Sequence, residues 1–123
     1  MKLLSALTLL FSYNVFAQKI VLNCESKADL GERYEFVMDI ENNQLKNKTF
    51  LAVYNQGGMG PDNMEMSAVA TEERLSVSNR KIFIESSFPL SISTKLLATE
   101  DFKKAEGVII SPNLIVEVEC AKR

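Results

Sequence analysis

The two cysteines, Cys24 and Cys120, constrain the fold of this 123-residue chain more than any other feature. They allow a single intramolecular pairing, which would join the first and last segments of the chain. A redox-active pair usually has the spacing Cys-x-x-Cys, and these two cysteines do not. Each cysteine shares a strand face with apolar residues, as a buried disulfide requires. These residues are Ile20, Leu22, Leu114, Val116 and Val118. The pattern predicts a structural disulfide that helps to close a β-sheet.

Residues 1–17 have the three parts of a secretory signal peptide. Lys2 precedes an apolar run over residues 3–11, and Ala17 ends the segment with a small side chain. The run is too short for a membrane anchor, which needs about 20 apolar residues. We therefore expect cleavage after Ala17, no membrane anchor afterwards, and a single β domain over residues 18–123. The short signal favours a bacterial source, with export to the periplasm or the medium, where disulfides persist.

Composition excludes several classes of function. The chain has 14 Lys and Arg against 16 Asp and Glu, a formal net charge of −2, and no His. Nucleic-acid binding needs a basic face, so we expect no nucleic-acid partner. Without His, the chain lacks Ser-His-Asp and Cys-His catalysis and the usual zinc sites. We expect no cofactor and a non-enzymatic role.

The dominant sequence period is two, the period of a half-buried strand. Tyr34, Phe36, Met38 and Ile40 form the clearest example, because charged residues fill most of the positions between them. Leu90 and Ile92 continue such an alternation after Pro89. The predicted strands cover about residues 20–24, 33–41, 48–54, 64–71, 75–77, 81–84 with 90–92, 108–110 and 114–120.

Two segments admit a helical alternative. Asp62 and Glu65 have the spacing of a capping box, although the alternation that follows favours a strand. Residues 99–102 could form one helical turn with Thr99 as its cap. About eight short strands separated by turn signals predict an all-β fold with at most that one short helical turn. The expected architecture is a small antiparallel β-barrel or sandwich closed by one disulfide.

The strongest break in the pattern is a glycine-rich segment, which we take as the candidate binding loop. It consists of Gln56, Gly57, Gly58, Met59, Gly60, Pro61, Asp62 and Asn63. It lacks the Gly-Lys-Ser/Thr of a phosphate loop. Binding groups concentrate on loops that a rigid sheet holds in place, although a plain connection is the alternative. Residues 99–104 form a second candidate loop.

Met59, Met64 and Met66 cluster beside this loop. Thioethers suit Cu(I), so the three methionines form a weak copper candidate. Methionine also fills irregular gaps in a core, and Met64 and Met66 would lie on one strand face. Core packing is therefore the favoured interpretation of these two residues.

The densest groups of carboxylates offer a candidate for glycoside hydrolysis, which needs two carboxylates across a cleft. The residues are Glu72, Glu73, Glu100, Asp101, Glu117 and Glu119. The chain offers few aromatic platforms for a sugar. Glu117 and Glu119 alternate with apolar residues, so we expect them on the solvated face of a strand.

These features favour an exported binding or inhibitor-like module that meets a protein partner through its loops. In size and disulfide-closed layout the chain is similar to bacterial periplasmic lysozyme inhibitors, but it carries none of their inhibitory motif. The alternative is a carrier of a small apolar ligand, held in a barrel interior among Phe36, Phe50 and Phe83.

Overall fold

The computed structural model describes residues 18–28, 31–55 and 64–123. The predicted signal peptide and the candidate binding loop over residues 56–63 lie outside these ranges. The described residues contain no helix with the length and apolar character needed to cross a bilayer.

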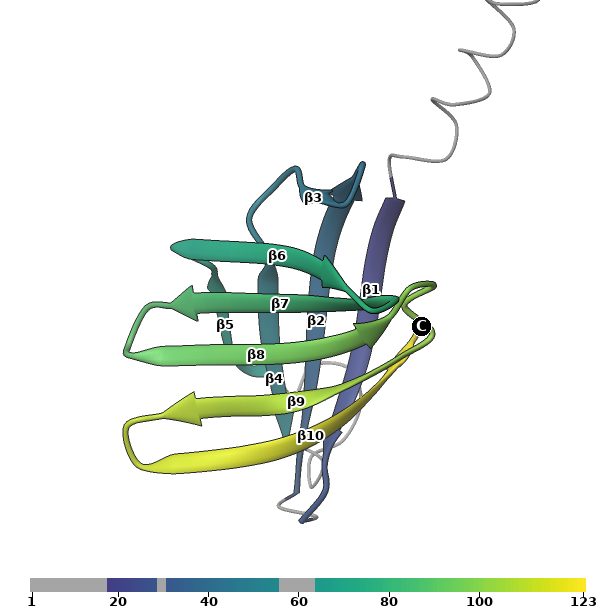
Figure 1. Cartoon of the computed structure of the whole chain (residues 1–123). Helices are drawn as coiled ribbons and strands as arrows, with labels where there is room; N and C mark the ends of the chain where they lie inside the picture. The colour runs from purple at the N-terminus through teal and green to yellow at the C-terminus, as the bar shows by residue number, and fades with distance from the viewer. Residues whose placement is uncertain (1–17, 29–30, 56–63) are drawn as a thin grey trace, which may run out of the picture.

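The described chain is all-β and antiparallel, as predicted from the sequence. Its strands belong to one sheet with the order β5-β4-β2-β1-β10-β9-β8-β7-β6, and β3 pairs with β2 beside this path. The sheet curls into a half-barrel, so that β6 to β10 cross in front of β1, β2, β4 and β5 (Figure 1). The strands are β1 (Gln18–Ser26), β2 (Glu32–Glu41), β3 (Gln44–Leu45), β4 (Phe50–Asn55), β5 (Met64–Val69), β6 (Glu72–Ser78), β7 (Lys81–Phe88), β8 (Ile92–Thr99), β9 (Lys104–Ser111) and β10 (Leu114–Lys122).

The expected helical turn over residues 99–102 is wrong, because this segment is the turn between β8 and β9. Thr99 is the last residue of β8 and caps no helix, and its Oγ1 donates to Oδ1 of Asp101 at 2.7 Å. Phe102 has a left-handed backbone, with φ of 61°, which ends any helical course. Its side chain is buried in the core.

The expected strand over residues 90–92 is also wrong at its start. Leu90 and Ser91 have φ angles of 65° and 60° and form the turn between β7 and β8. The apolar alternation of Leu90 with Ile92 therefore spans a hairpin tip and the first residue of β8, not one continuous strand. A strand does form over 64–69, so the helical alternative for this segment does not hold.

The core lies between the two crossing layers and is filled by the inward residues of nearly every strand. Phe36, Met38, Leu51 and Ile84 are among the largest side chains that are almost fully buried. Leu114 shares a face with buried Val116 and Val118, but it is exposed at the end of its strand.

The disulfide joins the two layers where β1 pairs with β10. Cys24 and Cys120 are directly opposite in the register, and their Cα atoms are 4.0 Å apart. Both residues are buried. The predicted pairing is thus confirmed, and it fastens the first long strand to the last in the middle of the sheet order.

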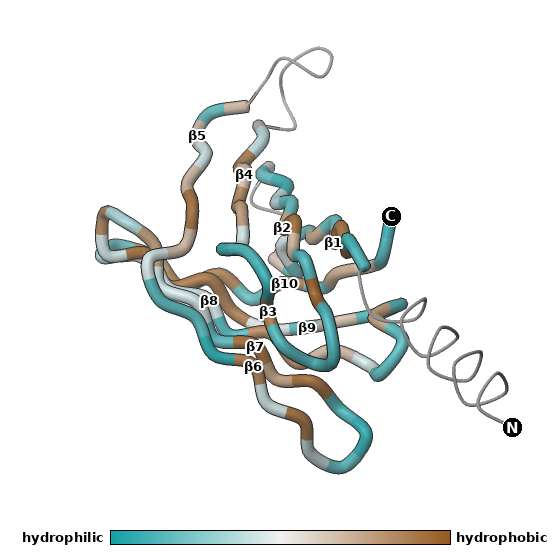
Figure 2. Tube along the Cα trace, turned by 90° about the horizontal axis from the view of Figure 1, so that it is seen from above, coloured by the Kyte–Doolittle hydropathy of each residue, from teal (hydrophilic) through white to brown (hydrophobic). Residues whose placement is uncertain are grey.

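At the opposite side, the chain itself joins the layers, because β5 leads directly into β6 at a corner (Figure 2). Glu73 fastens this corner, where its Oε1 accepts from the backbone N–H of Thr49 at 2.8 Å. Its Oε2 accepts from the hydroxyls of Thr49 and Ser86. One carboxylate therefore links β6 and β7 to the segment that precedes β4.

Gly107 allows β9 to approach β8 closely. A Cβ atom at this position would lie 1.9 Å from the carbonyl oxygen of Lys95, much closer than atoms can come. Glycine within a strand commonly marks such a close backbone approach. The close approach occurs where Gly107 is opposite Leu96 in the pairing of β9 with β8.

Candidate binding trough

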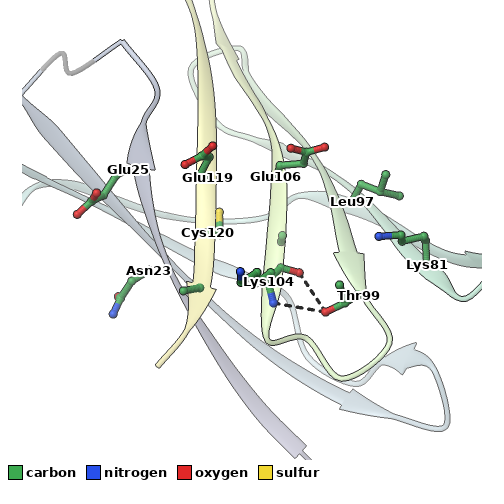
Figure 3. Close-up of a pocket in the computed structure, with 11 residues that line it drawn as sticks. Asn23, Glu25, Lys81, Leu97, Thr99, Lys104, Glu106, Glu119 and Cys120 are labelled. Atoms are coloured by element: carbon green, nitrogen blue, oxygen red, sulfur yellow. Dashed lines mark hydrogen bonds between the residues drawn. The ribbon is translucent and has the colours of Figure 1, made fainter.

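A hollow of about 660 Å³ lies on the outer face of the sheet where the two layers join. We call this hollow the outer trough. Figure 3 shows its side chains projecting from five neighbouring strands, β1 and β7 to β10. Those that carry chemistry are Asn23, Glu25, Lys81, Thr99, Lys104, Glu106 and Glu119. Leu97 adds an exposed apolar surface.

Three glutamates form an acidic row along the trough. Glu25 is directly opposite Glu119, and Glu119 is directly opposite Glu106. Figure 3 shows the three carboxylates side by side on β1, β10 and β9. Like charges in directly opposite positions destabilise a sheet. The acidic row is therefore an arrangement that folding alone does not favour.

The next register row of the outer face, over β6, β7 and β8, is arranged differently. Lys95 is opposite Glu85, and Glu85 is opposite Arg74. Arg74 and Glu85 also form an ion pair, which lowers the pKa of the Glu85 carboxyl, chiefly through the hydrogen bond from the guanidinium. Opposite charges thus alternate there, in contrast to the acidic row.

The acidic row has little compensation from cations. Lys27 Nζ lies 3.6 Å from Oε2 of Glu106. Within the described ranges, Glu25 and Glu119 have no Lys or Arg nitrogen within 4.0 Å. Arg33 is the cross-strand neighbour of Glu25, but its guanidinium stacks 4.4 Å from the ring centre of Tyr54.

Asn23 has an unpaired oxygen beside this row. Its Oδ1 is buried and, among the described residues, has no hydrogen-bond partner. Buried polar atoms nearly always have such a partner, so this oxygen is an exception within the sheet.

Two lysines border the trough on the next row. Lys104 is opposite Ala121, which in turn is opposite Asn23. Lys81 is opposite Thr99, across β7 and β8. The trough therefore has carboxylates along one side and ammonium groups along the other.

The turn between β8 and β9 holds this basic side in place. Thr99 Oγ1 lies 3.3 Å from the carbonyl oxygen of Lys104, as drawn in Figure 3. Asp101 accepts from the backbone N–H of Lys103 at 3.0 Å and from Thr99 Oγ1. These hydrogen bonds, the backbone one above all, hold the pKa of the Asp101 carboxyl below its usual range. The second candidate loop thus provides two residues of the trough wall, Thr99 and Lys104.

The methionines proposed as core residues or as a copper site lie outside the trough. Met66 packs against the core, whereas Met64 is 47% exposed, so the core interpretation is wrong for Met64. It lies at the start of β5, where the register with β4 shifts. Met59 lies outside the described residues, and the copper site stays a prediction.

The carboxylates proposed for glycoside hydrolysis are dispersed. Glu73 serves the corner between the layers, and Glu100 pairs with Arg80 at 3.2 Å. Glu117 and Glu119 are exposed, as expected. Within the described ranges, no group of three or more acidic or cysteine side chains is arranged to hold a metal ion.

Tyr34 is a titratable group that lies in the core rather than in the trough. Burial raises its pKa to about 12, and the nearby carboxylate of Glu32 adds to the shift. The phenol is therefore neutral at physiological pH and serves as a structural group of the inner face.

The three phenylalanines proposed to line a ligand cavity do not share one side of the sheet. Phe36 is buried in the core. Phe50 and Phe83 alternate with inward residues of β4 and β7, so they lie half-buried on the outer face. The expectation that these three residues surround one interior pocket is wrong.

Comparison of the chain with protein-family models, curated proteins and solved structures gave no match.

Proposed function

We propose that the chain is an exported, non-catalytic binding module that receives a cationic segment of a partner protein in the outer trough. The acidic row is the observation that supports this proposal. Repulsion among the carboxylates of Glu25, Glu119 and Glu106 lowers the stability of the free protein. A cationic partner would be attracted to the same three charges and would relieve this repulsion. Rules of folding are commonly broken at functional sites.

The chemistry of the trough selects the kind of partner. Ionised carboxylates accept hydrogen bonds but donate none. Arginine and lysine side chains supply charged donors, and charge-assisted hydrogen bonds are about twice as strong as neutral ones. A segment with closely spaced Arg or Lys residues therefore fits the acidic row.

The basic side of the trough gives the partner a direction. Lys81 and Lys104 would repel cations that lay across them and attract an acidic group. Electrostatic complementarity of this kind fixes orientation and speeds association more than it raises affinity. Leu97, which is opposite Glu106 in the register, offers apolar contact at the end of the acidic row.

The large inward side chains support a surface role. Residues such as Phe36, Leu51 and Leu96 are almost fully buried and fill the space between the layers. A barrel that carries a ligand needs room among its inward residues. The glycine-rich loop over residues 56–63 stays a second predicted contact of the same binding module.

The proposal can be tested by capture of partners from periplasmic or culture-medium proteins of the source organism. The baits are the wild-type protein, the trough variant Glu25→Gln/Glu106→Gln/Glu119→Gln, and a control variant. The control, Asp39→Asn/Glu41→Gln/Glu72→Gln, has the same change of net charge at residues that do not line the trough. We expect wild type and control to capture the same basic partner and the trough variant to lose it.

The captured partner should bind the wild-type protein more weakly as the salt concentration rises, because salt screens exposed charges. Equal capture by the trough variant and the control variant would contradict the proposal. Native mass spectrometry separates it from the carrier alternative. A bound mass that is lost on denaturation would favour a carrier instead.

A further inference from the structure

The acidic row continues along the same register line into two apolar side chains. Leu97 on β8 is opposite Glu106, and Phe83 on β7 is opposite Leu97. Figure 3 shows Leu97 next to Glu106, in line with the other two glutamates of the row. The line therefore has three carboxylates at one end and two apolar residues at the other.

The apolar end of this line lies in a second hollow of about 370 Å³, which we call the apolar hollow. Phe83, Leu97 and Val108 are its large apolar lining residues. Leu97 is 41% exposed, and the other two are half-buried. Leu97 and Glu106 also line the outer trough, so the two hollows adjoin. A concave site lined by neighbouring apolar side chains suits an apolar group of a ligand.

The charged residues of the apolar hollow are balanced, unlike those of the acidic row. Two lysines, Lys27 and Lys95, accompany two glutamates, Glu106 and Glu117. Lys27 Nζ already lies 3.6 Å from Oε2 of Glu106. A cation would therefore gain little in the apolar hollow and more along the acidic row. The two adjoining surfaces select different side chains.

We infer that the partner segment carries its basic residues at one end, over the acidic row, and an apolar residue such as Leu or Phe at the other, in the apolar hollow. The inference rests on the proposed function and adds the order of side chains in the partner. Four strand steps separate Glu25 from Phe83, about 19 Å at the usual strand spacing. About seven residues of extended chain span this distance, so one short segment reaches both surfaces.

Three peptides of that length, acetylated and amidated, serve as probes. The ordered peptide is Arg-Arg-Ala-Arg-Ala-Leu-Phe, with its basic residues at one end and its apolar residues at the other. The serine control, Arg-Arg-Ala-Arg-Ala-Ser-Ser, keeps the charge and lacks the apolar end. The interleaved control, Arg-Leu-Ala-Arg-Phe-Ala-Arg, has the composition of the ordered peptide in a different order.

NMR titration of the isotope-labelled, disulfide-bonded protein at low salt measures the three dissociation constants. We expect the ordered peptide to bind at least about tenfold more tightly than either control, because its two apolar side chains lose contact with water. The backbone amides of Phe83, Leu97 and Val108 should shift more with the ordered peptide than with the serine control.

A matched pair of variants tests the apolar hollow itself. Leu97→Thr should remove most of the advantage of the ordered peptide over the serine control. Val77→Thr should keep this advantage, because Val77 is also exposed but lines neither hollow. The amide spectrum of each variant shows whether it is folded. An equal effect of the two substitutions would contradict the inference.

The peptides also separate this inference from the proposed function. Equal affinity of the ordered peptide and the serine control would overturn the inference and leave the proposed function standing. Equal affinity of the ordered peptide and the interleaved control would overturn the order of side chains. If no peptide bound at concentrations up to about 1 mM, the range of weak association, both proposals would be wrong.

Discussion

Among single residues, Glu73 contributes most clearly to the architecture. It looked like one of two adjacent exposed acids, yet it accepts hydrogen bonds from Thr49 and Ser86 across the corner between the layers. Thr49 is only 1% exposed, so water does not readily replace its partner. A carboxylate that satisfies buried donors acts as part of the core, although its residue type suggests the surface.

The substitution Glu73→Ala should lower the free energy of unfolding by about 2 kcal/mol, because it leaves the buried N–H of Thr49 without an acceptor. Chemical denaturation at neutral pH measures this loss. The matched control is Glu72→Ala on the exposed face of the same strand, which should change stability by less than about 0.5 kcal/mol. Similar losses in both variants would show that Glu73 has no special structural role.

Gly107 leads to a second residue-scale prediction. Gly107→Ala should destabilise the fold by about 2 kcal/mol or more, because its Cβ would collide with the Lys95 carbonyl oxygen and force β8 and β9 apart. Gly31→Ala is the comparison, since open space surrounds Gly31 and the cost there comes from its positive φ alone, about 1 kcal/mol. Thermal unfolding of both variants would refute this explanation if Gly107→Ala were the milder of the two.

At the scale of strands and hairpins, alternation alone predicted which residues face inward along β1, β2 and β10. It did not predict turns in which residues other than glycine adopt a left-handed backbone. Leu90 was assigned to a strand and Phe102 to a helical turn, because neither residue type signals positive φ. The positive φ angles of these residues depend on contacts with parts of the chain that are distant in sequence. A local sequence pattern cannot predict such contacts.

Part of the acidic row follows from the register that the disulfide imposes. If Cys24 is opposite Cys120 in an antiparallel pair, then Glu25 must be opposite Glu119, as the register shows. The turn at residues 112–113 then places Glu106 opposite Glu119. The predicted disulfide therefore contained the pair of Glu25 and Glu119. The predicted turn over residues 111–113 would instead have placed Ala105 opposite Glu119, and the observed two-residue turn brings Glu106 there. The unpaired oxygen of Asn23, in contrast, depends on side-chain packing that no sequence pattern specifies.

The row predicts an unusual response to mutation. Glu119→Gln removes the central charge of three and should raise the free energy of unfolding by about 0.5 kcal/mol. The gain should shrink in high salt, which screens the repulsion. Glu117→Gln is the control on the same exposed strand face, where the opposite residue on β9 is uncharged Val108. Denaturation curves at low and high salt would contradict the repulsion if Glu119→Gln were neutral or destabilising at low salt.

At the scale of the whole molecule, the predicted fold class was right and the choice between barrel and sandwich was left open. The structure is intermediate, because one sheet curls so far that its two halves cross as layers. Sequence reasoning expected about eight strands, whereas the described residues form ten, including the two-residue β3. Such short elements depend on pairing with a distant strand rather than on their own residues.

The disulfide determines how strongly those two layers hold together. Cys24 and Cys120 are 96 residues apart, so the bond restricts almost the whole unfolded chain. Reduction should lower the free energy of unfolding by about 4 kcal/mol in the chain-entropy description, a large part of the stability of a domain of this size. Because β1 and β10 would still pair, we expect the reduced protein to fold but to unfold at a much lower denaturant concentration. Denaturation with and without reductant measures the difference, and the Cys24→Ala/Cys120→Ala variant controls for the reductant itself. An unchanged midpoint after complete reduction would mean that hydrogen bonds and core packing alone join the layers.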